Sequence, residues 1–257
     1  MKILLITFVF LFSTFLIAEE NMAYKQYSSI LITPDYTQLN QFAIKMEHHN
    51  KTFHSSGPYR ARVFNVVSGS DVGKIYWIMG PSTYSHLDDK PSNKPHNNDW
   101  TKNVMPLVTK IEHGEYWREK KIIQPLVDNL SPTSQETEDS MNIWLIRFMA
   151  ENSNIDRQRF NDLYDRVAET YSATKKIKYG AVLDNYLLQG NKNDRHVIVA
   201  LGMQKWSDMD IDLQFRQRYE ELFGTDSFQQ FREELLTIFT TDWQEIWVLN
   251  KKMSGME

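Results

Sequence analysis

The chain contains no cysteine, which excludes disulfide bonds, thiol nucleophiles and thiolate metal sites. Glycine and proline are also few, with 10 and 8 residues among 257, so the chain is neither collagen-like nor of low complexity. Basic residues are not in excess, since 29 Lys and Arg stand against 33 Asp and Glu. The resulting net charge of −4 gives no electrostatic footprint for nucleic acid, and we expect no nucleic-acid partner.

The chain also lacks an apolar run as long as the about 20 residues that a membrane span needs. The N-terminal run from Ile3 to Ile17 is shorter, follows Lys2, and is succeeded by the small residue Ala18 and then by Glu19. This pattern is typical of a signal peptide cleaved near Ala18, and an uncleaved N-terminal membrane anchor is the alternative. We therefore predict export to the periplasm or secretion, with no stable membrane insertion after cleavage.

Aromatic residues, by contrast, are abundant, with 7 Trp, 12 Tyr and 14 Phe. They predict either a core of large residues or an aromatic-lined ligand cavity. No nucleophile elbow, phosphate-binding loop or dinucleotide glycine motif occurs, and no carboxylate pair combines helical spacing with an apolar face. The sequence therefore identifies no cofactor and leaves open whether the protein is an enzyme.

Two stretches of the chain occur twice in the same order. The segment 59–67 (YRARVFNVV) is echoed 120 positions later by 179–187 (YGAVLDNYL). The segment 80–88 (GPSTYSHLD) is then echoed by 202–210 (GMQKWSDMD). These echoes indicate an internal repeat.

The periodicity predicts the order β-α-β-β-α-β in each half of the chain. In the first half the expected strands cover 28–33, 59–68, 74–79 and 116–123, with helices after Asp35 and over 104–111. In the second half they cover 142–149, 179–188, 196–201 and 243–249, with helices after Asp156 and over 213–239. We thus expect a signal peptide (1–18), a first unit (24–128), a polar linker (129–140) and a second unit (141–252).

A β-α-β-β-α-β unit is a ferredoxin-like plait, and two such units can join their uncovered sheet faces. With its two echoes, the chain resembles the dimeric α+β barrel superfamily over nearly all of residues 24–252. That superfamily includes antibiotic-biosynthesis-type monooxygenases and the haem-binding relatives of chlorite dismutase. The resemblance implies an α+β fold in which two tandem ferredoxin-like repeats form a pseudo-dimeric barrel within one chain.

Strand alternation suggests which side chains line that barrel. We assign the apolar face of Ala61 and Val63, and the matching face of Ala181 and Leu183, to the covering helices. The opposite faces differ between the halves and supply four candidate ligand-binding residues: Arg62, Phe64, Asp184 and Tyr186. Arg62 and Asp184 could form a polar pair within an aromatic pocket, or a structural ion pair or solvated groups at a barrel rim.

Among the seven histidines, His86 lies inside the second echo, where the other half carries Asp208. A neutral imidazole there could ligate haem iron or act as a base, so His86 is the fifth candidate. The spacing of His48, His49 and His54 matches no known metal motif, and we predict no metal site.

The leading hypothesis is an exported protein, monomeric or homodimeric, that binds a small apolar ligand inside the barrel. A cofactor-free monooxygenase that positions an electron-rich substrate for oxygen chemistry is the alternative, and haem binding through His86 is a weaker one. A barrel filled completely by side chains would instead leave a structural or interaction protein.

Overall fold

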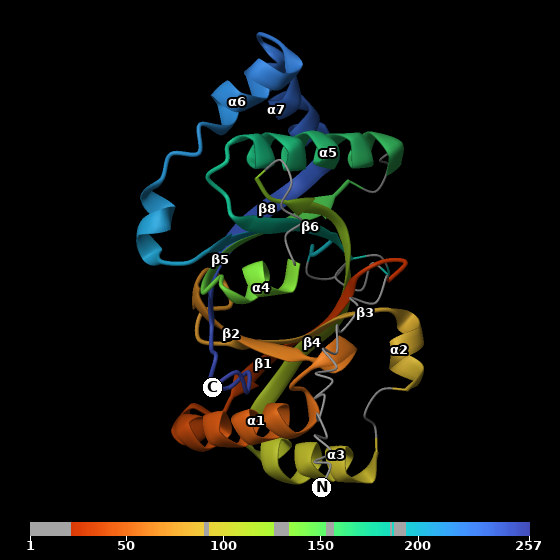
Figure 1. Ribbon diagram of the computed structural model, residues 1–257, viewed down its shortest axis with the longest axis vertical. Helices are drawn as coiled ribbons and strands as arrows, with labels where there is room; N and C mark the ends of the chain where they lie inside the picture. The colour runs from red at the N-terminus through yellow and green to blue at the C-terminus, as the bar shows by residue number, and fades with distance from the viewer. Residues whose placement is uncertain (1–21, 90–92, 126–133, 153–156, 186, 188–193) are drawn as a thin grey trace, which may run out of the picture.

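The computed structural model describes residues 22–257, apart from 90–92, 126–133, 153–156, 186 and 188–193 (Figure 1). The expected signal peptide, the candidate Tyr186 and the first part of the expected linker lie outside these residues. Eight antiparallel strands close into one barrel in the order β1-β3-β2-β8-β5-β7-β6-β4. They are β1 (Gln26–Pro34), β2 (Ala61–Ser68), β3 (Ile75–Ser82), β4 (Val108–Ile123), β5 (Ile143–Glu151), β6 (Tyr179–Asp184), β7 (Val197–Met203) and β8 (Phe239–Leu249).

Helices pack against the outside of the barrel on two opposite sides, toward the two ends of the long axis of the molecule (Figure 1). One end carries α1 (Leu39–Phe53) and α3 (Lys94–Asp99), and the other carries α5 (Arg157–Ala173), α6 (Phe215–Phe223) and α7 (Ser227–Ile238). Two shorter α-helices also lie in the described part of the chain: α2 (Tyr84–Asp88) follows β3, and α4 (Ser134–Asp139) precedes β5. Among the described residues, no helix combines the length and the apolar character that crossing a membrane requires.

The two halves of the chain contribute four strands each in equivalent order. The first half runs β4-β1-β3-β2 and the second runs β8-β5-β7-β6. Two seams join them: β2 pairs with β8, where Phe64 lies opposite Leu249, and β4 pairs with β6, where Arg118 lies opposite Asp184. The predicted α+β class and the barrel are therefore confirmed.

Both faces of most strands are buried, because side chains fill the barrel interior on one side and pack under the helices on the other. The interior cluster includes Tyr76, Trp117, Phe148 and Trp247. A second cluster lies under α5, α6 and α7, and a third lies under α1. Burying this apolar area, at roughly 25 cal/mol per Å², is what stabilises a chain without disulfides.

The expected helix over 104–111 is wrong. Short 3-10 and π turns occupy Trp100–Leu107, and β4 then begins at Val108 and continues for 16 residues. Gly114, expected to end a helix, lies inside β4 opposite Ile30 of β1. Pairing with β1 along most of its length outweighs the helical spacing of the apolar residues, since local propensity yields to tertiary contacts.

The C-terminal tail returns to the first half of the chain and fastens α1 to β2. The Asn50 side-chain amide donates to the carbonyl oxygen of Met253 at 2.7 Å, and the Val63 N–H donates to the Ser254 hydroxyl at 2.8 Å. Both Asn50 and Ser254 are buried. The tail therefore belongs to the folded core and positions the end of α1.

Candidate functional site

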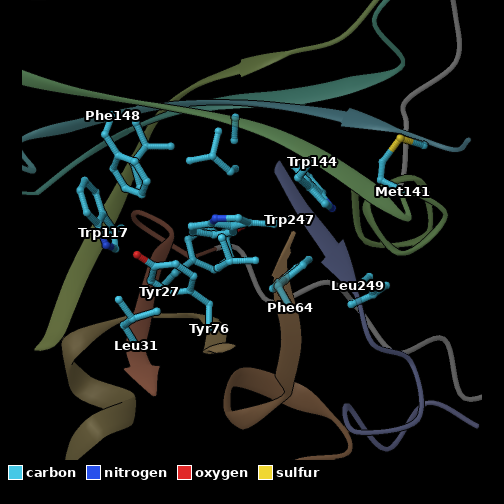
Figure 2. Close-up of a cluster of buried hydrophobic side chains, with 14 of the residues drawn as sticks. Tyr27, Leu31, Phe64, Tyr76, Trp117, Met141, Trp144, Phe148, Trp247 and Leu249 are labelled. Atoms are coloured by element: carbon cyan, nitrogen blue, oxygen red, sulfur yellow. The ribbon is translucent and has the colours of Figure 1, made fainter. Parts of the chain in front are cut away.

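The barrel interior contains a cavity of about 80 Å³. Figure 2 shows large aromatic side chains entering the interior from several strands, among them Trp117, Trp144 and Trp247. These three and Phe64 line the cavity, and the small residues Ala181 and Ala200 leave the space open. The interior is thus neither empty nor completely filled, and its walls are almost entirely apolar.

One end of the cavity is polar and centres on Arg62, whose side chain is 4% exposed. Its guanidinium lies 3.1 Å from the Glu138 carboxylate and 3.0 Å from that of Asp139. Arg60 pairs with the second oxygen of Asp139 at 2.6 Å. Both acids belong to α4, which lies within the outline of the barrel in Figure 1. The segment expected to be a linker therefore supplies two carboxylates to the site.

Burial changes the proton affinities of the groups around Arg62. It raises the pKa of Glu138 and, together with the charge of Glu138, the pKa of the Tyr27 hydroxyl. The pKa of Glu119 is raised by burial as well, and so is that of Tyr179. These shifts mark a polar end that is largely withdrawn from water, where a carboxylate is a stronger base than in solution.

A second polar cluster lies in the barrel wall and interior, around the ion pair of Arg195 and Glu115. Both side chains are almost fully buried, and Arg195 Nε lies 3.0 Å from Glu115 Oε1. The guanidinium carbon sits 3.9 Å from the centre of the Phe148 ring, close enough for a cation–π contact. The Trp117 indole donates to Glu115 at 3.2 Å, and the Trp247 indole donates to Glu245 at 2.8 Å. Carboxylates therefore hold two of the indoles that line the cavity.

Of the candidate residues, Arg62 and Phe64 line the cavity together. Asp184 lies elsewhere: it is 2% exposed and its carboxylate is 4.0 Å from Lys120 Nζ. Arg62 instead forms its ion pairs with the acids of α4. The fourth candidate, Tyr186, is outside the described residues.

The expected face assignment holds for β2 and is wrong for β6. On β2, Ala61 and Val63 pack under the helices. On β6 it is Tyr179, Ala181 and Leu183 that line the cavity, whereas Val182 packs under the helices. Residues of β2 and β6 that are 120 positions apart therefore face opposite sides of the barrel wall. The echo is out of step with the structure by one residue, and a shift of one residue exchanges the two faces of a strand. Since β6 is buried on both faces, its apolar pattern did not distinguish them.

His86 serves the local structure of α2. Its Nδ1 accepts the Thr83 backbone N–H at 3.0 Å, and the His86 carbonyl oxygen accepts the Tyr59 hydroxyl. Asp208 accepts backbone N–H groups in the same way at the matching turn of the second half. His86 is not among the residues that line the cavity. The cavity of about 80 Å³ is also far too small for a haem, so these residues do not fit that group.

No family model matches the chain, and no curated protein matches its sequence. Among solved structures, a candidate monooxygenase of Fusobacterium nucleatum superposes with a TM-score of 0.54 at 5% identity, covering 89% of this chain and 94% of that one. Chlorite dismutase from Candidatus Nitrospira defluvii superposes with a TM-score of 0.53 at 7% identity, covering 91% of this chain and 95% of that one. The chain has the dimeric α+β barrel fold.

A third similar structure, a candidate monooxygenase of Lactobacillus acidophilus, gives a TM-score of 0.51 at 13% identity and covers 88% of this chain and 94% of that one. At such identities the likeness extends to the fold alone. Because one fold of this kind supports unrelated chemistries, function has to be argued from the site.

Proposed function

We propose that the protein is exported and binds a small apolar molecule in the barrel cavity beside Arg62. The observation that carries the proposal is an apolar space of about 80 Å³ in a barrel interior into which large aromatic side chains pack. Protein interiors rarely keep voids of this size, because each lost contact costs stability. We also propose that the two halves descend from one ferredoxin-like unit, since their strand orders are equivalent.

The size of the cavity limits the ligand. An apolar cavity of about 150 Å³ is known to take benzene or xenon, so a cavity of about 80 Å³ is smaller than a bound ring needs. A ring with one small substituent therefore sets the upper limit, and the walls must move outward to admit it. The polar end offers hydrogen-bonding groups on Tyr27, Tyr179 and Glu138, which favour a ligand with one polar substituent. Phenol is the simplest molecule of this description.

A cofactor-free monooxygenase is the second candidate, and one observation favours it. Glu138 lines the apolar space and has a raised pKa, and such a carboxylate can remove a proton from a bound substrate. Deprotonation would make the substrate electron-rich enough to react with oxygen. Oxygen consumption with small phenols, in the wild type and in Glu138→Gln, would test this candidate, because the variant keeps the shape of the site but lacks the base.

The binding proposal is tested by isothermal titration calorimetry with phenol. We expect saturable binding of one phenol per wild-type chain. Ala200→Leu places an isobutyl group in the cavity and should abolish that binding, whereas Ala23→Leu adds the same group at an exposed position and should not. Circular dichroism shows whether each variant folds. The absence of saturable binding to the wild type, or equal binding to Ala200→Leu, would contradict the proposal.

A further inference from the structure

Three histidines that are separated in sequence meet outside the barrel, between α1 and α3. His49 lies on α1, His54 follows the last residue of that helix, and His96 lies on α3. One ring nitrogen from each lies within 4.8 Å of the other two, and the Nε2 atoms of His54 and His96 are 3.1 Å apart. Figure 1 shows α1 and α3 side by side at the same end of the molecule.

The other nitrogen of each ring is hydrogen-bonded to an oxygen atom. His49 Nδ1 lies 2.8 Å from the Asp99 carboxylate, His54 Nδ1 lies 2.8 Å from the carbonyl oxygen of Tyr59, and His96 Nδ1 lies 3.1 Å from the Asn97 side-chain oxygen. Since these oxygens accept, each Nδ1 carries the proton and each Nε2 presents a lone pair. Metal-bound histidines are oriented in the same way, by a carboxylate or a carbonyl oxygen on the far side of the ring.

Two features of the cluster are unfavourable unless a cation is bound. His49 is fully buried, and its Nε2 has no hydrogen-bond partner in the described part of the chain. An unsatisfied buried polar atom costs about 1–3 kcal/mol. The Nε2 atoms of His54 and His96, 3.1 Å apart, can share a hydrogen bond only if one ring moves its proton from Nδ1 and gives up the bond to its oxygen. A single cation between the three rings would satisfy all three nitrogens.

We propose that His49, His54 and His96 form a binding site for a divalent transition-metal ion of the zinc class. Three imidazoles without thiolates suit zinc, copper, nickel or cobalt, and exclude calcium and magnesium as preferred ions. A tetrahedral zinc ion with Zn–N bonds of ~2.0–2.1 Å holds its ligand nitrogens ~3.3–3.4 Å apart, so small ring movements complete the site. The fourth coordination position is open to water or to an external ligand.

Aromatic side chains enclose the site. Phe53, Trp77 and Trp100 contact the three imidazoles with ring centroids 5.0–5.2 Å apart. The Trp77 indole is itself held by a 2.9 Å hydrogen bond to Asn50, the residue next to His49. Such an apolar shell strengthens the bonds between ligand and metal by excluding water, and rigid walls keep the rings oriented.

The test is calorimetric titration of the EDTA-treated, exported chain with Zn²⁺ in a buffer that does not bind the metal. We expect one Zn²⁺ per chain, and at least tenfold weaker binding by His96→Gln, which alters the most exposed of the three ligands. Asp99→Asn should weaken binding as well, because a carboxylate that orients a metal-bound histidine typically contributes 10–100-fold to the affinity. His48→Gln is the matched control, since His48 is an exposed histidine adjacent to His49 on α1.

Absence of Zn²⁺ binding by the wild type, unchanged binding by His96→Gln, or an equal loss in His48→Gln would overturn the proposal. Thermal unfolding gives a second readout, because a ligand that binds only the folded chain raises the melting temperature. Saturating Zn²⁺ should raise the melting temperature of the wild type and of His48→Gln, but should leave the melting temperature of His96→Gln unchanged. The site is outside the barrel, so Ala200→Leu should bind Zn²⁺ normally, which separates this proposal from the cavity proposal.

Discussion

The buried ion pair of Arg195 and Glu115 provides a quantitative test of how the barrel interior is held together. Each residue is 2% exposed, and three hydrogen bonds join the side chains: Nε to Oε1 at 3.0 Å, Nε to Oε2 at 3.2 Å and Nη2 to Oε2 at 3.1 Å. Replacing Arg195 by methionine keeps much of the packing against Phe148 but leaves the Glu115 carboxylate buried and without its cation. Removing one partner of a buried pair costs about 3–5 kcal/mol.

The double variant Arg195→Met/Glu115→Gln should recover part of that loss. Glutamine carries no charge and can still accept the Trp117 indole, so the remaining cost is mainly one of packing. We expect a coupling free energy on the order of 1–3 kcal/mol between the two sites. Urea denaturation monitored by circular dichroism gives the free energy of unfolding of each variant.

The matched control is Arg147→Met, which removes the same group from an exposed ion pair with Asp242. Exposed pairs contribute about 0–1 kcal/mol, so this variant should unfold nearly like the wild type. Equal destabilisation by Arg195→Met and Arg147→Met would refute the reasoning. So would a double variant whose loss equals the sum of the two single losses.

Two further predictions concern pH and backbone geometry. Burial raises the pKa of Glu119 in the folded chain above 4.5, so the folded chain holds this proton more tightly than the unfolded chain. The wild type should therefore lose stability relative to Glu119→Gln as the pH rises from 4.5 through that pKa. Denaturation at several pH values measures this difference. Gly69 has φ of +104°, and a Cβ added there would lie 2.8 Å from the Gln244 carbonyl oxygen, whereas Gly57 has φ of +64° and open space around it. Gly69→Ala should therefore lower the free energy of unfolding by more than the ~1–2 kcal/mol expected of Gly57→Ala. Equal destabilisation of the two variants in thermal unfolding would contradict this.

The barrel could be predicted from sequence because its strands are signalled locally. Seven of the eight expected strands overlap the observed strands with only small shifts at their ends, and β4 differs most, beginning at Val108 rather than 116. The short helical turns after β3 and β7 also follow the second echo, with His86 and Asp208 in the same capping role. These features depend on turn chemistry and apolar spacing within a few residues.

The register of β6 could not be predicted in the same way. An echo 120 residues apart aligns Ala61 with Ala181, yet the first packs under helices and the second lines the cavity. Where both faces of a strand are apolar, alternation carries no information about which face is interior. Long-range pairing with β4 and β7 decides it.

The polar components of both proposed sites were missed for a related reason. Glu138 and Asp139 belong to a segment whose composition is typical of a solvated linker, and only the closed barrel brings them to Arg62. His96 lies 42 residues after His54 and follows a polar, proline-containing stretch, so no spacing motif connects them. Contacts between distant segments leave no local signature.

The most direct measurement of the cavity proposal is a crystal structure of the chain under xenon pressure. Xenon enters apolar cavities without needing hydrogen bonds, so it reports whether the space is accessible from solvent. We predict a xenon peak between Ala181, Ala200 and Trp247, and its loss in Ala200→Leu. A wild-type interior without xenon, with side chains filling that space, would contradict ligand binding in the barrel.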